Sequence, residues 1–139
     1  MISRIVLLAV TVALGACSTG FVRKNGTIVW QEFDEGLGLH YVAIYGVDAS
    51  TFVKLTDNFG KDRSHIYFQD FQSDADPATF QALGNYYGKD SKHAYFEVIP
   101  LTNVDLASFR EVKGTSYARD KTKCILRGYE VDCAGAPGP

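Results

Sequence analysis

The sequence contains no apolar run long enough to cross a bilayer as a helix. Its longest apolar stretch, residues 5–14, is interrupted only by Thr11. These ten residues would rise about 15 Å as a helix, half of the ~30 Å hydrocarbon core. No long segment shows helical periodicity either, which argues against a helical fold. The chain has the length of a single domain and can bury a core of its own.

Fingerprints of common enzyme and nucleotide-binding sites are also missing. There is no Gly-x-Ser-x-Gly, no phosphate-binding loop, no dinucleotide fingerprint and no His-Glu-x-x-His. The formal net charge is −2, and the basic residues form no stripe of the kind that nucleic acid requires. We therefore predict a protein that is not an enzyme, has no cofactor and binds no nucleic acid.

Metal-ligating residues are present but poorly spaced for a metal site. His65 and His93 occupy equivalent positions of a repeat, and no His-x-x-x-His spacing accompanies them. Asp70, Asp74 and Asp76 lie close together and offer carboxylates to calcium, but they lack the glycine and terminal glutamate of an EF-hand loop. We expect a solvated loop in which Asp76 caps a turn, and no metal site.

The N-terminus has the layout of a secretory signal peptide over residues 1–16, with Arg4 before the apolar run. It ends in Leu-Gly-Ala-Cys, residues 14–17, which resembles the lipobox of bacterial lipoproteins. The resemblance implies cleavage before Cys17, acyl chains such as palmitate on that residue, and membrane attachment. Ser18 resembles the outer-membrane sorting pattern, so we expect an outer-membrane protein facing the periplasm. We expect residues 17–26 to be a lipidated tether and residues 27–139 the folded domain.

A repeat organises most of the remaining chain. The string GKDRSHIYF at residues 60–68 returns 28 residues later as GKDSKHAYF at residues 88–96. Phe52, Phe80 and Phe109 extend the pattern with spacings of 28 and 29 residues. The unit therefore has about 28 to 30 residues and occurs in roughly three copies.

Each part of the unit has a local structural interpretation. His-Ile-Tyr-Phe and His-Ala-Tyr-Phe are typical of strands, and the Lys/Arg-Asp pair before them is typical of a turn that the aspartate stabilises. The segment from Asp76 to Phe80 begins with a capping residue and Pro77, which predicts one helical turn. We predict a mainly β, single-domain fold of antiparallel strand-turn-strand repeats with short helical turns.

The strings KDRSHIYF, KDSKHAYF and RDKTKCIL resemble the repeats of the DKNYY family of bacterial proteins, many of which are predicted lipoproteins of unassigned function. The resemblance covers roughly residues 48–126. It implies a repeated β-structure and transfers no catalytic residues.

Cys124 and Cys133 are the two cysteines after Cys17, and an even count in an exported domain predicts a disulfide. A two-residue loop at Gly128-Tyr129 would place the cysteines directly opposite each other. Strict alignment with the earlier repeats would instead place the turn at Arg127-Gly128 and separate the cysteines. We expect the first register and a structural disulfide.

Tyrosine is abundant, with eight residues. Tyrosines on exposed strand positions make good recognition surface, and Tyr45, Tyr67, Tyr86 and Tyr95 are the candidates for partner binding. The alternative is that they pack in the core.

The leading hypothesis for the function is a non-catalytic module that binds an unidentified periplasmic protein, for instance as an immunity protein or inhibitor of a toxin or lytic enzyme. The alternative function is a cell-envelope enzyme acting on peptidoglycan or another polysaccharide through an acidic pair.

Overall fold

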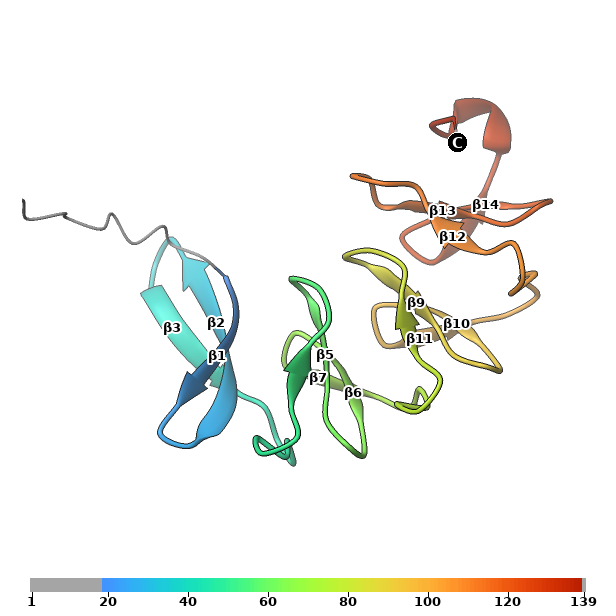
Figure 1. Cartoon of the computed structure of the whole chain (residues 1–139). Coiled ribbons are helices and arrows are strands. Elements are labelled where there is room, and N and C mark those ends of the chain that lie inside the picture. The colour runs from blue at the N-terminus through green and yellow to red at the C-terminus, as the bar shows by residue number, and fades with distance from the viewer. Residues whose placement is uncertain (1–18, 139) are drawn as a thin grey trace, which may run out of the picture.

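The computed structural model describes residues 19–138, and they form four small antiparallel sheets in one domain (Figure 1). Strands account for 43% of the described residues and helix for 2%. The prediction of a mainly antiparallel β fold is therefore confirmed.

Sheet 1 is a three-stranded meander at the N-terminal end. It contains β1 (Gly20–Lys24), β2 (Thr27–Asp34) and β3 (Gly38–Ala43), in that order. The expected boundary between tether and domain was wrong, because β1 lies within residues 17–26. The Phe21 ring packs against the Trp30 ring with 5.1 Å between centroids, so the fold begins near Gly20. The predicted signal peptide and Cys17 lie outside the described residues.

Each of the other three sheets is one copy of the sequence repeat, and we call them units 1, 2 and 3. Every unit is a meander of four strands paired in chain order. Unit 1 contains β4 (Val53–Lys54), β5 (Phe59–Lys61), β6 (Ile66–Phe68) and β7 (Phe71–Ser73). Unit 2 contains β8 (Gln81–Ala82), β9 (Tyr87–Lys89), β10 (Ala94–Phe96) and β11 (Ile99–Leu101). Unit 3 contains β12 (Arg110–Glu111), β13 (Tyr117–Arg119), β14 (Cys124–Leu126) and β15 (Tyr129–Val131).

The hydrophobic core is divided into three clusters, and each cluster joins two successive sheets. Trp30 of sheet 1 shares a cluster with Tyr67 of unit 1, and Phe59 of unit 1 shares one with Tyr95 of unit 2. Tyr87 of unit 2 shares the third with Ile125 of unit 3. No single sheet of two- and three-residue strands buries enough surface alone, so the sheets stabilise each other by stacking. Figure 1 shows them following one another along a curved array.

The Gly-Lys-Asp string at the centre of the repeat is explained by its contacts. A Cβ atom added to Gly88 would lie 2.2 Å from Cζ of Phe80, so the ring of the same unit occupies the space that a side chain would need. The next residue, Lys89, donates from Nζ to the carbonyl of Leu106 at 2.8 Å, and Lys61 donates likewise to Pro77 at 3.2 Å. The lysine therefore ties units 1 and 2 to the turn that opens the next unit.

The aspartate of the string is the hydrogen-bonding centre of its unit. In unit 2, Oδ1 of Asp90 accepts from the backbone N–H groups of Lys92 and His93, both at 2.8 Å. Its Oδ2 accepts from the N–H of Asp76 at 3.0 Å and from the hydroxyl of Tyr95 at 2.8 Å. The carboxylates of Asp62 and Asp120 make the corresponding backbone bonds. The predicted aspartate-stabilised turn is confirmed, and the carboxylate also holds the start of the unit.

The predicted helical turns appear as hydrogen-bonded turns at the start of each unit. The N–H of Phe80 donates to the carbonyl of Asp76 at 3.0 Å, while the Asp76 carboxylate accepts from the N–H of Ala78 and the hydroxyl of Thr79. Asp76 is therefore a turn cap, as expected. A short 3₁₀ helix, η1 (Cys133–Gly135), follows the last strand.

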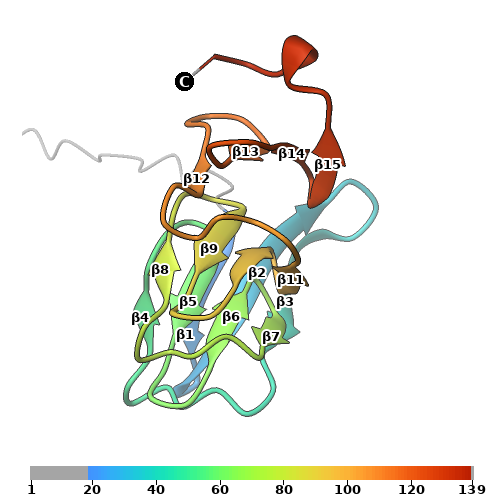
Figure 2. The same ribbon diagram turned by 90° about the vertical axis from the view of Figure 1, so that its right-hand side faces the viewer.

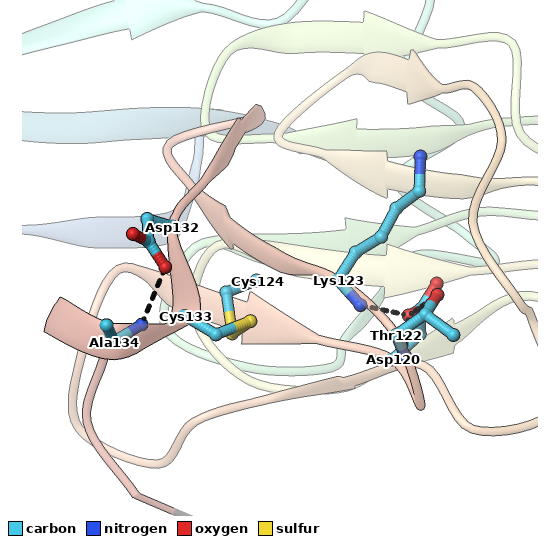
Figure 3. Close-up of a disulfide and its surroundings, with 7 residues drawn as sticks. All are labelled: Asp120, Thr122, Lys123, Cys124, Asp132, Cys133 and Ala134. Carbon is cyan, nitrogen blue, oxygen red and sulfur yellow. Dashed lines mark hydrogen bonds between the residues drawn. A yellow bond between two sulfur atoms is a disulfide. The ribbon is translucent and has the colours of Figure 1, made fainter.

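The disulfide between Cys124 and Cys133 is confirmed, with 5.2 Å between the Cα atoms (Figure 3). The expected register was wrong, because Cys124 pairs with Val131 and Leu126 with Tyr129. The turn therefore falls at Arg127-Gly128, as repeat alignment requires. Arg127 has a φ of 49°, close to the 54° of Gln69 and Glu97 at the same turn of units 1 and 2. The chain still brings the cysteines together, because it bends into η1 directly after β15.

We predict that Asp90→Asn lowers the free energy of unfolding by about 2 to 4 kcal/mol. Both carboxylate oxygens of Asp90 accept hydrogen bonds, and the asparagine NH₂ group that replaces one of them is a donor and cannot accept. Burial alone raises the pKa of Asp90, but the hydrogen bonds from Asp76, His93, Lys92 and Tyr95 outweigh it and hold the pKa at about 2. The unfolded carboxyl, with a pKa of about 3.9, takes up its proton first as the pH falls. Urea unfolding should therefore show the parent losing stability between about pH 4 and pH 2.

The same titration should be shallower in Asp90→Asn than in the parent. The matched control is Asp74→Asn, because Asp74 is exposed in the loop before the same unit. Equal stability of parent and Asp90→Asn at neutral pH would contradict the assigned role of the carboxylate.

We also predict that replacing both Cys124 and Cys133 by alanine lowers the free energy of unfolding by about 2 to 3 kcal/mol, because the disulfide restricts the unfolded chain. Thermal unfolding with and without reductant provides the measurement. Reductant should destabilise the parent and leave the double variant unchanged. Alkylation of both cysteines in the folded, oxidised protein, seen by intact mass, would argue against the bond.

Candidate protein-binding surface

Three exposed apolar side chains stand at equivalent positions of the three units. Phe71, Ile99 and Tyr129 are the first residues of β7, β11 and β15, and they are 60%, 58% and 77% exposed. Each of these strands is the last of its sheet, and Figure 2 shows them on the same side of the array. We call these three residues the edge row.

The strands that carry the edge row are poor templates for adding a further strand. Each has only three residues, and Pro100 at the middle of β11 has no backbone N–H to donate. The edge row is therefore suited to contacts through its side chains and not to the addition of a further strand.

A pocket of about 330 Å³ lies between units 2 and 3 next to the edge row. Its lining includes Tyr86, Phe96 and Arg127. Phe96 is paired across the sheet with Ile99, and Arg127 precedes Tyr129 by two residues. Burial raises the pKa of Glu97, which also lines this pocket. The pocket therefore places one acidic and one basic side chain, Glu97 and Arg127, beside the apolar edge row.

The four tyrosines proposed for partner binding divide into two exposed and two buried residues. Tyr45 is 85% exposed and Tyr86 37%, so their partner-binding role stays a prediction. Tyr67 and Tyr95 are 0% and 3% exposed, so the prediction of a surface role was wrong for them. Both hydroxyl groups donate to the repeat aspartate at 2.8 Å, which lets the rings enter the core without an unpaired polar atom. Burial, followed by the bond to the carboxylate, raises the pKa of both phenols.

The edge row was missed from the sequence, although a signal for it exists. In each copy an apolar residue stands three positions after the last residue of the preceding strand: Phe68 to Phe71, Phe96 to Ile99, and Leu126 to Tyr129. Alignment of the three two-residue turns would have shown an apolar side chain opening the last strand of each sheet, where it is exposed because no further strand covers the edge.

The histidines and aspartates of the repeat contact neighbouring groups of their own units. His65 and His93 each lie edge-on to a tyrosine, Tyr67 and Tyr95, with ring centroids 6.2 and 6.1 Å apart. Among residues 19–138, no group of three histidine, cysteine or acidic side chains is placed to hold a metal ion. The buried carboxylates of Asp62, Asp90 and Asp120 have lowered pKa values and accept several hydrogen bonds each, although burial opposes that shift. They serve as ionised acceptors within the repeat.

Comparison with known proteins agrees with the repeat. Residues 70–128 match the DKNYY family, which confirms the family resemblance over this part of the chain. The matched segment runs from the β6–β7 turn to the β14–β15 turn, and so covers units 2 and 3 through β14. A search of curated proteins and a search of solved structures each found no match.

We predict that Tyr95→Phe lowers the free energy of unfolding by about 1.5 to 3 kcal/mol, the range of a hydrogen bond to a charged group. The matched control is Tyr45→Phe, which loses the same hydroxyl from a side chain that is 85% exposed and should leave stability unchanged. Chemical denaturation of the two variants provides the comparison. Equal stabilities would mean that the Tyr95 hydroxyl contributes nothing through Asp90.

Proposed function

We propose that this chain, built on the DKNYY repeat, is a non-catalytic module that binds another protein of the bacterial envelope through its edge row. The observation that supports the proposal is the recurrence of exposed apolar residues at one position of all three units. Scattered apolar residues on a surface are common, but Phe71, Ile99 and Tyr129 are repeated in register with the fold.

The composition of this surface suits protein recognition. Aromatic residues and arginine are enriched in the energetically important parts of interfaces, and the surface combines Phe71, Tyr129, Tyr86 and Arg127. One specific form of the proposal is an immunity protein or inhibitor, in which the edge row and the adjacent pocket engage a toxin or a lytic enzyme.

We also propose where the protein is located in the cell. The lipobox at residues 14–17 supports acylation of Cys17 and attachment to the outer membrane facing the periplasm. Within residues 19–138, no helix is long and apolar enough to span a bilayer.

The test is capture of envelope proteins by the full chain and by two variants. In the first, Phe71, Ile99 and Tyr129 are all replaced by serine. In the second, Val53→Ser removes a 53% exposed apolar residue from β4, the strand at the opposite edge of unit 1. We expect a protein that binds the parent and Val53→Ser, and whose affinity for the triple variant is at least ~10-fold lower, because a central apolar anchor contributes more than 1 kcal/mol.

Equal capture by both variants would contradict the edge row as the binding surface. Cleavage of peptidoglycan by the purified chain, with no protein captured, would favour the enzyme hypothesis instead.

A further inference from the structure

Sheet 1 has an apolar outer face at the end of the array. Residues that oppose each other in an antiparallel sheet share a face, and the pairs here are Phe33 with Leu39 and Gln31 with Tyr41. Phe33, Leu39 and Tyr41 are 52%, 45% and 42% exposed. The alternating residues Trp30 and Val42 face the core shared with unit 1. The face turned away from the stack therefore exposes aromatic and aliphatic side chains.

This composition is unusual for the end of a stacked array, where the outer face of the terminal repeat is ordinarily polar. The β2–β3 hairpin adds a further apolar side chain, because Leu37 is 77% exposed. Figure 1 shows sheet 1 at one end of the array, with unit 1 on its other side. We call Phe33, Leu37, Leu39 and Tyr41 the end face.

The described part of the chain begins beside the end face. Gly20 pairs with Gln31, so the chain enters sheet 1 near the end of β2 that carries Phe33. Cys17 precedes Gly20 by three residues, which span at most about 11 Å when fully extended. A lipid group on Cys17 would hold Gly20, which pairs with Gln31 beside the end face, within that distance of a bilayer.

Both positive and negative side chains lie around the end face, and their mixture bears on which lipid headgroups it can contact. The Lys24 ammonium lies over the ring of Tyr41, 3.4 Å from its centroid. The hairpin carries Asp34 and Glu35, and the Asp34 carboxylate accepts from the backbone N–H groups of Gly36 and Leu37 at 2.8 and 3.0 Å. Cationic and anionic groups of this mixture fit zwitterionic headgroups better than a strongly anionic surface.

We propose that the end face rests in the headgroup region of the membrane to which Cys17 anchors the chain. This inference depends on the lipid anchor of the proposed function and does not depend on the edge row. Aromatic and aliphatic side chains are favoured at that depth, where the rings are buried and the polar ends stay hydrated. The contact adds a second attachment to the acyl chains and sets the array in one orientation.

Tryptophan fluorescence in vesicles with brominated acyl chains provides the test. The acylated full chain is reconstituted into phosphatidylcholine vesicles as the parent, as Leu39→Trp, as Phe33→Trp and as Val53→Trp. The native Trp30 is 2% exposed and gives the baseline in every sample. We expect bromine to quench the added signal of Leu39→Trp and Phe33→Trp about two-fold, because interfacial side chains lie ~5–10 Å into the headgroup and acyl boundary. The Val53→Trp signal should stay unquenched.

The outcomes separate this inference from the proposed function. Vesicle-bound protein in which neither end-face tryptophan is quenched would overturn the membrane contact and leave the anchor intact. Unquenched end-face tryptophans together with cross-linked dimers would assign the face to a second copy of the chain. Protein that carries no acyl mass and does not bind the vesicles would overturn the anchor and the contact together. The capture experiment tests the edge row independently of both.

Discussion

A single buried carboxylate in each unit holds together segments that are too short to be stable alone. The strands of the units have only two or three residues, shorter than the roughly five to six residues usual for a strand in a globular protein. Asp90 compensates by accepting bonds from the residue that opens the unit, from two residues of the turn and from a tyrosine of the following strand. Because the carboxylate remains ionised, each of these bonds is charge-assisted and stronger than a neutral one. The core clusters and the edge row depend on this arrangement, since it fixes where each strand begins.

Much of the architecture was predictable because the repeat is encoded locally. The spacing of phenylalanine and aspartate defined the units, and the capping chemistry of aspartate defined the turns. The disulfide followed from the cysteine count, but its register did not, because a two-residue turn fits equally well at Arg127-Gly128 and at Gly128-Tyr129. The start of the fold was missed because Gly20–Lys24 resembles a basic linker, and its pairing with β2 and the contact of Phe21 with Trp30 appear only in the folded chain.

The candidate surface was harder to predict because exposure is a tertiary property. Tyr67 and Tyr86 are chemically identical, yet one is buried against an aspartate of its own unit and the other lines a pocket between units. Contacts between units are also invisible in a single copy. Thr56 of unit 1 accepts the N–H of Phe59 through its hydroxyl. Unit 2 has Gly84 at that position, and the carboxylate of Glu111 from unit 3 accepts the N–H groups of Asn85, Tyr86 and Tyr87 instead.

The lysine contacts from one unit to the next have a consequence for how such a protein can change in length. Lys61 and Lys89 each reach a backbone carbonyl, and every opening turn presents one whatever its side chains are. A copy inserted or deleted between two units would therefore still find an acceptor for this lysine in the next opening turn. Each added copy would also lengthen the edge row by one apolar residue. Under the function proposed for that row, duplication of the unit would adjust binding strength by valency, without a new contact having to be selected at any one site.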